Sequence, residues 1–374
     1  MRKKLNVLMA IETGGPGGGE QVFLNIARNI DREQYNPSVI LLKKGWLYDQ
    51  LSQDDIKITI ISSQRSWDLS FLYRLIKSCR QQKIDVIHSH FTGANLYASL
   101  AGSILRIPVV VTFHNELILP WWSCSYSKFK HFLIRNFASR IVMVAEFMKK
   151  DYVNIAKYPP NKLLTIYNGI DLDRDKVDID STALRKELGL RDDDLLVGHV
   201  ANLRPPKGHE YLIRAAKLIC EILPNVKFLL VGEDNRENLK GDIEKQIYDL
   251  NLNENVKLLG YRADVPELLR LIDVFVLPSI SEGHPLSVIE AMAASRPIVA
   301  TNVGGLPEIV EDGLNGYLVK SENPSALAEK ILVLLKNKNL REQMGKMGRK
   351  TVEENFSIKT MIDNYQNLYR ELLS

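Results

Sequence analysis

Two glutamates, Glu282 and Glu290, are the residues of this sequence whose types and spacing best suit chemistry. Pro285 is expected to open a helix that runs to Ser295, because proline is favoured at the first helical position. That segment carries no charge other than Glu290 and is apolar enough to be buried. Burying an unpaired carboxylate costs several kcal/mol, so Glu290 is expected to meet a cation, a backbone donor or a ligand hydroxyl.

The start of the same helix favours an anion beside Glu290. The first N–H groups, at about Leu286 and Ser287, have no acceptor within a helix and lie on the same face as Glu290. Helix N-termini attract phosphate. The spacing therefore predicts that a phosphate and a sugar hydroxyl can bind side by side.

This helix is predicted to connect two parallel strands. The β-prone runs 274–277 and 298–301 flank it, and Pro278 ends the first of them. In open parallel sheets ligands bind beyond the carboxyl ends of the strands, and Glu282 falls at such an end.

From Glu282 onward the sequence resembles a known family. Two glutamates separated by seven residues, followed by Ala-Met-Ala-Ala-Ser-Arg-Pro-Ile-Val-Ala-Thr-Asn-Val-Gly-Gly-Leu-Pro-Glu, resemble the signature of retaining family 4 glycosyltransferases of GT-B fold. Further matches, in family order, are Asn168-Gly169-Ile170-Asp171, Lys207-Gly208, Val231-Gly232-Glu233 and Gly260-Tyr261. The resemblance implies an α/β fold with two Rossmann-like, doubly wound parallel-sheet domains that face a cleft.

The sequence itself shows strands and helices alternating in two series. The expected strands are 5–11, 38–42, 56–61, 85–88, 109–113 and 141–144, then 195–200, 227–231, 256–259 and 274–277. We expect an acceptor domain over residues 1–170, a nucleotide-sugar donor domain over 171–356, and a linker over about 168–181. The helix 357–374 is implied by the resemblance to pack back on the first domain.

The composition is that of an ordinary globular protein. The chain has 374 residues, 45% hydrophobic and 25% charged, which favours two or three domains. No segment approaches the roughly 18 to 20 apolar residues of a membrane span. The start reads as a first strand rather than a signal peptide. Three widely spaced cysteines indicate neither zinc nor a disulfide framework, so a cytoplasmic location is expected.

Basic and acidic residues are distributed unevenly between the two halves of the chain. Residues 1–170 hold 22 Lys and Arg against 12 Asp and Glu, whereas residues 171–374 hold 27 against 33. Within the basic half, aromatic residues alternate with cations from Trp121 to Arg140; they are Trp121, Trp122, Tyr126, Phe129, Phe132 and Phe137, with Lys128, Lys130, His131, Arg135 and Arg140. This pattern suits peripheral contact with an anionic membrane or a lipid-linked acceptor. A solvated basic face and a core helix remain alternatives, and nothing further supports a nucleic-acid partner.

The resemblance and the residue types assign a diphosphate-binding group. Lys207, Arg204 and the backbone amides of Leu286 and Ser287 are candidates, because cations and a helix N-terminus stabilise a departing diphosphate. The family arginine, five residues before the lysine, is replaced here by Asn202, so Arg204 is the candidate substitute. The alternative is that Arg204 and Lys207 are solvated loop cations.

The two glutamates receive different roles. Glu290 resembles the family residue that accepts hydrogen bonds from both ribose hydroxyls, and the alternative is a core ion pair. Glu282 corresponds to the glutamate near the donor sugar, where it would orient hydroxyls and stabilise positive charge; it is not assigned as a nucleophile, and a surface glutamate is the alternative. The backbone around Tyr261 and Arg262 is expected to contact the base.

The first domain is expected to supply acceptor-side groups. His114 follows the strand 109–113 and resembles a family histidine that reaches the transferred sugar, where it can bond a hydroxyl or pass a proton. His88 and His90 are expected to point to opposite faces, with His90 the better acceptor candidate. Gly17, Gly18 and Gly19 belong to a cluster that permits close backbone approach and positive φ. A structural histidine and a plain tight turn are the alternatives.

These assignments predict a retaining hexosyltransferase. The donor would be a UDP- or GDP-sugar, and the acceptor a lipid-linked molecule or glycan in bacterial polysaccharide or surface-glycan synthesis. No metal or other cofactor is expected, since no Asp-x-Asp of metal-binding context falls in the expected cleft, and Asp171-Leu172-Asp173 lies in the linker. A GT-B nucleotide-sugar epimerase and a catalytically silent nucleotide-sugar-binding subunit are the alternatives.

Overall fold

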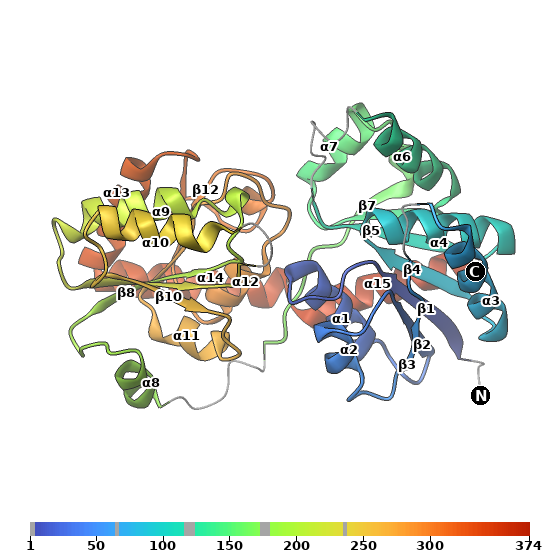
Figure 1. The fold of residues 1–374 in the computed structure, drawn as a ribbon, viewed down its shortest axis with the longest axis horizontal. Coiled ribbons are helices and arrows are strands. Elements are labelled where there is room, and N and C mark those ends of the chain that lie inside the picture. The colour runs from blue at the N-terminus through green and yellow to red at the C-terminus, as the bar shows by residue number, and fades with distance from the viewer. Residues whose placement is uncertain (1–3, 64–66, 116–123, 173–179, 235–237) are drawn as a thin grey trace. The chain divides into compact units, whose positions relative to one another are not determined.

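The computed structural model describes residues 4–63, 67–115, 124–172, 180–234 and 238–374. The chain forms two compact units of alternating strands and helices, shown in Figure 1. Unit 1 comprises Met1–Gly169 together with Ile358–Ser374, and unit 2 comprises Ile170–Ser357. Asp173, Trp121 and Trp122 lie outside the described residues.

Unit 1 is built on a seven-stranded parallel sheet with the strand order β3-β2-β1-β4-β5-β6-β7. Its strands are β1 (Leu5–Ile11), β2 (Tyr35–Leu41), β3 (Lys57–Ile60), β4 (Val86–His90), β5 (Val109–Phe113), β6 (Arg140–Met143) and β7 (Leu163–Thr165). Its helices are α1 (Gly18–Asn29), α2 (Trp46–Leu51), α3 (Leu69–Gln81), α4 (Thr92–Leu105), α6 (Ser125–Phe137), α7 (Phe147–Asn154) and α15 (Ile358–Leu373).

The central strands β4 and β5 of unit 1 are buried along their whole length because helices cover both faces of the sheet. All five residues of β5, for example, are buried. Apolar side chains of α3, α4, α6 and α7 join the strands in one core. Helices α1 and α15 pack together on the other face, as Figure 1 shows.

Unit 2 has a six-stranded parallel sheet with the order β10-β9-β8-β11-β12-β13. Its strands are β8 (Leu195–Val200), β9 (Val226–Val231), β10 (Val256–Gly260), β11 (Val274–Leu277), β12 (Ile298–Thr301) and β13 (Gly316–Val319). Its helices are α8 (Ser181–Glu187), α9 (His209–Cys220), α10 (Leu239–Asp249), α11 (Val265–Leu271), α12 (Leu286–Ala293), α13 (Pro324–Lys336) and α14 (Lys338–Asn355). Helices α9, α10 and α13 cover one face of this sheet (Figure 1).

Helix α15 belongs to unit 1 although it follows α14 of unit 2 in the chain. Its amphipathic sequence buries Tyr365, Gln366 and Tyr369. The Gln366 side chain accepts a hydrogen bond from the backbone N–H of Asp31 at 2.9 Å, and the Tyr369 hydroxyl lies 2.6 Å from His88 Nδ1. These polar contacts fix the helix on the sheet of unit 1.

The predicted fold class, two α/β domains with doubly wound parallel sheets, is confirmed. Every predicted strand is present, and five of them have the predicted bounds, at β1, β5, β8, β11 and β12. The expectation that Pro285 is the first helical residue was wrong. Pro285 is the N-cap of α12, with φ −71° and ψ 117°, and the helix begins at Leu286.

Candidate active site

The strand order of each unit reverses at one point, and both points carry candidate residues. In unit 2 the reversal lies between β8 and β11, which lead to Lys207 and Glu282. In unit 1 it lies between β1 and β4, which lead to Glu12 and Phe91. Open α/β sheets bind ligands in the crevice that forms at this point, outside the carboxyl ends of the strands.

The side chains of Lys207 and Glu282 form a buried ion pair. Lys207 Nζ lies 2.7 Å from Glu282 Oε1 and 2.9 Å from Oε2. The Ser279 hydroxyl donates to Glu282 Oε1 at 2.6 Å. Glu282 is only 6% exposed, and Ser279 is fully buried. The alternative of a surface glutamate at position 282 is therefore wrong, because its charge is desolvated and balanced by Lys207.

Two glycines let the loops approach closely enough to make this pair. Gly208 follows the short 3₁₀ helix Pro205–Lys207 with φ 69°, and a Cβ there would overlap the carbonyl oxygen of Pro278. Gly304 has φ 55°, and a Cβ there would overlap the carbonyl oxygen of Glu282. Because both positions have left-handed backbone and no space, a side chain at either would push the loops apart.

Helix α12 presents its N-terminus at the same end of the sheet, directly after Glu282. Its N-cap residue is Pro285, whose side chain makes no capping hydrogen bond to the first turn. The N–H groups of Leu286 and Ser287 are therefore donors of the kind that bind phosphate.

Glu290 differs from expectation in its exposure. It is half-buried rather than enclosed in the core, whereas its neighbours Val288, Ile289 and Ala291 are fully buried. Because α12 turns that part of its circumference away from the core, the glutamate keeps access to its surroundings. The fully desolvated carboxylate of this segment is that of Glu282 and not that of Glu290.

The two arginine candidates lie in different loops of unit 2. Arg204 is exposed at the start of the loop that carries Lys207. Arg262 follows β10, the edge strand, and its guanidinium bonds Asp264 at 2.6 and 2.8 Å and Glu187 at 2.7 Å. The hydrogen bonds that Arg262 donates to these two carboxylates raise its pKa. The Arg262 side chain is thus held by carboxylates of unit 2. This arrangement leaves the backbone around Tyr261 and Arg262 as the group expected to contact the base.

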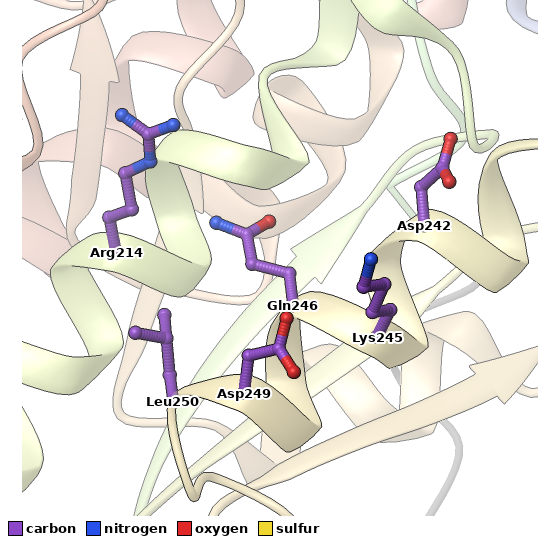
Figure 2. Close-up of a pocket in the computed structure, with 6 residues that line it drawn as sticks. All are labelled: Arg214, Asp242, Lys245, Gln246, Asp249 and Leu250. Carbon is purple, nitrogen blue, oxygen red and sulfur yellow. The ribbon is translucent and has the colours of Figure 1, made fainter.

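A pocket of about 310 Å³ lies elsewhere on unit 2 (Figure 2). It is lined by Arg214 of α9, by Leu250, and by residues of α10, namely Asp242, Lys245, Gln246 and Asp249. Figure 2 shows charged side chains rising from two neighbouring helices. The pocket shares no residue with the donor-site candidates and lies over the helical layer rather than at the strand ends.

In unit 1 the structure joins His114 to His90. His90 Nδ1 and His114 Nε2 are 2.8 Å apart, and the rings stack with centroids 5.0 Å apart. Burial lowers the pKa of His114 to about 3 and that of His90 well below its usual value. Both rings are therefore neutral near pH 7, so one nitrogen of this pair donates and the other accepts.

The expectation that His88 and His90 point to opposite faces was wrong. Their ring centroids are 4.4 Å apart, because residues two apart on a strand share a face. His88 bonds Tyr369 at 2.6 Å and Thr112 at 2.8 Å, both in the core. His88 is thus structural, while His90 contacts the candidate His114.

The glycine cluster begins helix α1 rather than forming a left-handed turn. Gly17 is the N-cap, and Gly18 and Gly19 are the first helical residues. None of these three has positive φ, so that part of the expectation was wrong. Gly19 is needed for a different reason, since a Cβ there would overlap the Phe91 ring. Gly18 is exposed, with nothing near the position of a Cβ, so backbone approach remains open there.

Helix α6 carries most of the basic aromatic segment. Phe129, Phe132 and Phe137 are 50, 47 and 41% exposed. His131 instead faces the core, where its Nδ1 lies 2.8 Å from the Tyr158 hydroxyl and burial lowers its pKa to about 4. The core-helix alternative fails for the phenylalanines and holds for His131.

Comparison with known proteins identifies the family. A model described as Glycosyltransferase Family 4 matches residues 16–174, and one described as Glycosyl transferases group 1 matches residues 180–351. N-acetyl-alpha-D-glucosaminyl L-malate synthase of Bacillus anthracis is 30% identical, over 100% of this chain and 98% of that protein. The chain belongs to the family 4-like glycosyltransferases of GT-B fold.

Two further proteins resemble this glycosyltransferase over nearly its full length. UDP-Gal:alpha-D-GlcNAc-diphosphoundecaprenol alpha-1,3-galactosyltransferase of Escherichia coli is 27% identical over 95% of this chain and 94% of that protein. The crystal structure of Anabaena HepE in complex with UDP-glucose matches with a TM-score of 0.89 at 25% identity, covering 98% of this chain and 100% of that one. Among the helices of the described ranges, none is long and apolar enough to cross a membrane.

Sequence reasoning missed three residues of these sites. Ser279 donates a hydrogen bond to the Glu282 carboxylate, and its position after β11 was the only signal in the sequence that could have identified it. Glu12 follows β1; burial raises its pKa, while Lys130 and the backbone N–H groups of Gly93 and Ala94 lower it. Phe91 has φ 67° and ψ 157°. Such a backbone conformation costs on the order of 1 to 3 kcal/mol in a residue with a side chain, and it has no sequence signal.

Proposed function

We propose that this glycosyltransferase moves a hexosyl or acetamidohexosyl group, with retention of configuration, from a UDP- or GDP-sugar to a lipid-linked or glycan acceptor. The setting would be bacterial polysaccharide or surface-glycan synthesis in the cytoplasm. The names of the Bacillus anthracis and Escherichia coli relatives and the UDP-glucose complex of HepE support this choice. The observation that carries it is the Lys207–Glu282 pair beside the N-terminus of α12.

Lys207 and Glu282 can each still form a hydrogen bond with a ligand. An ammonium has three N–H donors, and Lys207 uses two of them on Glu282, so one can bind a phosphate oxygen. Glu282 Oε1 already accepts from Lys207 and Ser279, whereas Oε2 accepts only from Lys207 among the contacts of the described residues. Oε2 can therefore accept a sugar hydroxyl while Lys207 meets the diphosphate.

The same contacts argue against Glu282 as a covalent nucleophile. Its lone pairs are engaged by an ammonium and a hydroxyl, which lowers the reactivity of a carboxylate. Its charge can instead stabilise the positive charge that grows on the donor sugar as the diphosphate leaves. Glu282 would thus position and stabilise the donor sugar.

Helix α12 would complete the donor site. The N–H groups of Leu286 and Ser287 would bind the diphosphate, and Glu290, one turn further on, would accept hydrogen bonds from the ribose hydroxyls. Lys207, assisted by Arg204, would supply positive charge where a metal ion does so in other transferases, so we propose that no metal is required.

Unit 1 would contribute the acceptor side. His114 follows β5 and shares a hydrogen bond of 2.8 Å with the neutral His90, which couples the tautomers of the two rings. A neutral imidazole can bond a sugar hydroxyl and pass a proton. Gly18 offers an exposed backbone position at the start of α1.

The test of this function combines a donor screen with one matched pair of variants. UDP- and GDP-sugars are incubated with wild type, Glu282→Gln and Glu267→Gln, and released nucleotide and the sugar product are measured. We expect wild type and Glu267→Gln to cleave one donor, and Glu282→Gln to lose at least tenfold in kcat with donor affinity nearly kept. Release of an epimerised free sugar, or donor binding without cleavage, would support the alternatives instead.

We also propose that unit 1 binds anionic membranes through α3 and α6. Neither helix contains an acidic residue, and together they carry Arg74, Lys77, Arg80, Lys128, Lys130 and Arg135. Exposed apolar residues join this basic face, and Trp67 links the two helices by a ring contact of 5.6 Å with Phe129. A basic face with aromatic residues suits an interface rich in anionic lipid.

Vesicle co-sedimentation tests the membrane proposal. Wild type should bind vesicles that contain phosphatidylglycerol and not vesicles of phosphatidylcholine alone. Phe129→Ala with Phe132→Ala should weaken binding about tenfold, since two half-exposed phenylalanines would lose about 1.4 kcal/mol or more of burial. Tyr248→Ala, at an exposed aromatic residue of unit 2, is the control. Equal binding to both vesicle types would refute the proposal.

A further inference from the structure

Glu12 blocks the N-terminus of helix α4. It follows β1, and its carboxyl group accepts hydrogen bonds from the backbone N–H groups of Gly93 and Ala94. Burial raises the pKa of Glu12, and these hydrogen bonds and Lys130 partly offset that rise. The approach is so close that a Cβ on Gly93 would overlap the carboxylate. A helix N-terminus otherwise attracts anions. In this chain the carboxyl group of Glu12 already occupies that place.

An aromatic ring and an imidazole follow the two strands next to β1 in this part of the sheet, β4 and β5. Phe91, two residues before Gly93, is half-buried, and its ring centroid lies 4.9 Å from that of His114. The tip of the ring, around its Cζ atom, lies against Gly19. Three strand ends of unit 1, those of β1, β4 and β5, thus bring together a carboxylate, an aromatic face and a neutral imidazole at the reversal of the strand order.

This set of groups suits a sugar and not an acid. A carboxylate accepts hydrogen bonds from hydroxyl groups, and an aromatic face packs against the apolar C–H face of a sugar ring. A second carboxylate placed at the same point would meet the charge of Glu12 and would find the α4 N–H groups already bonded. Lys130 is the cation that acts on Glu12 from the side of α6, and it balances part of this charge.

We propose that Glu12 and Phe91 form an acceptor subsite for a neutral, polyhydroxylated sugar ring, and that Glu12 excludes acceptors that present a carboxylate there. The inference rests on the proposed transferase function and specifies its acceptor. It sets this chain apart from the Bacillus anthracis relative, whose name gives L-malate, a dicarboxylate, as the acceptor part of its product. A neutral glycan or the sugar of a lipid-linked glycan fits the subsite.

Transfer assays test the subsite with two acceptor probes. Octyl N-acetylglucosaminide is the neutral probe and L-malate the anionic one, with the donor that wild type cleaves. The variants are Glu12→Gln and, as the matched control, Glu33→Gln at an exposed glutamate of the same unit. We expect wild type to use only the glycoside, Glu12→Gln to raise the KM for the glycoside at least tenfold, and Glu33→Gln to keep the wild-type KM. Equal use of malate by wild type, or an unchanged KM in Glu12→Gln, would overturn the proposal.

A binding measurement decides the matter even if wild type accepts neither probe. Thermal unfolding is followed with L-malate and no donor. L-malate should raise the midpoint temperature of unfolding of Glu12→Gln, in which no carboxylate lies at the N-terminus of α4. It should leave the midpoint temperatures of wild type and Glu33→Gln unchanged. Equal stabilisation of all three proteins, or of none, would overturn the proposal. Failure of the underlying transferase function has a different signature, since wild type would then bind and cleave no UDP- or GDP-sugar.

Discussion

Replacing Lys207 by methionine should destabilise unit 2 in the absence of any substrate. Methionine keeps much of the aliphatic stem of lysine and removes the charge. Glu282, 6% exposed, would then be buried without its cation, because Ser279 alone cannot balance it. Removing one partner of a buried pair costs about 3 to 5 kcal/mol; with a quarter of the Lys207 side chain exposed, at 26%, we expect about 3 kcal/mol.

The reverse change should cost less. In Glu282→Ala the ammonium of Lys207 can turn to water, so we expect about 1.5 kcal/mol from the lost hydrogen bonds and the packing of Ser279. The double variant should cost about 2 kcal/mol, because no unpaired buried charge remains. The three values give a coupling energy of about 2 to 3 kcal/mol.

Urea unfolding followed by far-ultraviolet circular dichroism measures these free energies. Tryptophan fluorescence reports only on unit 1, since the four tryptophans, at 46, 67, 121 and 122, all precede residue 123. Lys217→Met is the matched control, because its ion pair with Glu221 is exposed and should contribute less than about 1 kcal/mol. Equal costs for Lys207→Met and Glu282→Ala that simply add in the double variant would refute the reasoning.

Three further predictions concern the reaction and acid stability. Transfer activity should survive excess EDTA; activity that disappears and returns with Mg²⁺ or Mn²⁺ would show a metal-held diphosphate. Arg204→Ala should lower kcat/KM by roughly tenfold to a thousandfold, about 1.4 to 4 kcal/mol, and Lys207→Ala should lower it by at least as much. Near-normal kinetics of Arg204→Ala would show that Lys207 and the N-terminus of α12 stabilise the diphosphate leaving group without Arg204. All seven histidines are buried with lowered pKa, so below their usual pKa of 6.5 the unfolded chain binds more protons. As the pH is lowered below 6.5, the free energy of unfolding should then fall by up to about 1.4 kcal/mol per pH unit for each histidine. Equal stability against urea at pH 7 and at pH 5.5 would contradict this prediction.

The strands were predictable because most of them are continuous apolar runs. Val109–Phe113 is buried on both faces and therefore consists of β-branched and aromatic residues bounded by other residue types. The edge strands β7 and β13 were not predicted. Leu163–Thr165 is half-buried throughout, and Gly316–Val319 is partly so and begins with glycine. Short edge strands of this kind carry no periodic pattern that separates them from loops.

The sequence predicted which residues belong to the candidate site better than it predicted which of them contact one another. Sequence position placed Lys207 and Glu282 at strand ends, but their pairing joins residues 75 apart in the chain, which no local pattern encodes. The apolar run around Glu290 predicted a buried carboxylate, whereas the half-buried position follows from how α12 is rotated on the sheet. The strained backbone of Phe91 depends on packing against Gly19 and His114 and has no counterpart in residue type.

Calorimetric titration with nucleotide sugars tests the central claim most directly. UDP- and GDP-sugars are titrated in EDTA into wild type, Glu290→Ala and the control Glu254→Ala, which removes an exposed glutamate of the same unit. We predict that one nucleotide class binds wild type and the control equally, and that Glu290→Ala loses at least tenfold in affinity, since its carboxylate would bond the ribose. Unchanged donor affinity in Glu290→Ala would contradict the ribose assignment, and no binding of any nucleotide sugar by wild type would contradict the account as a whole.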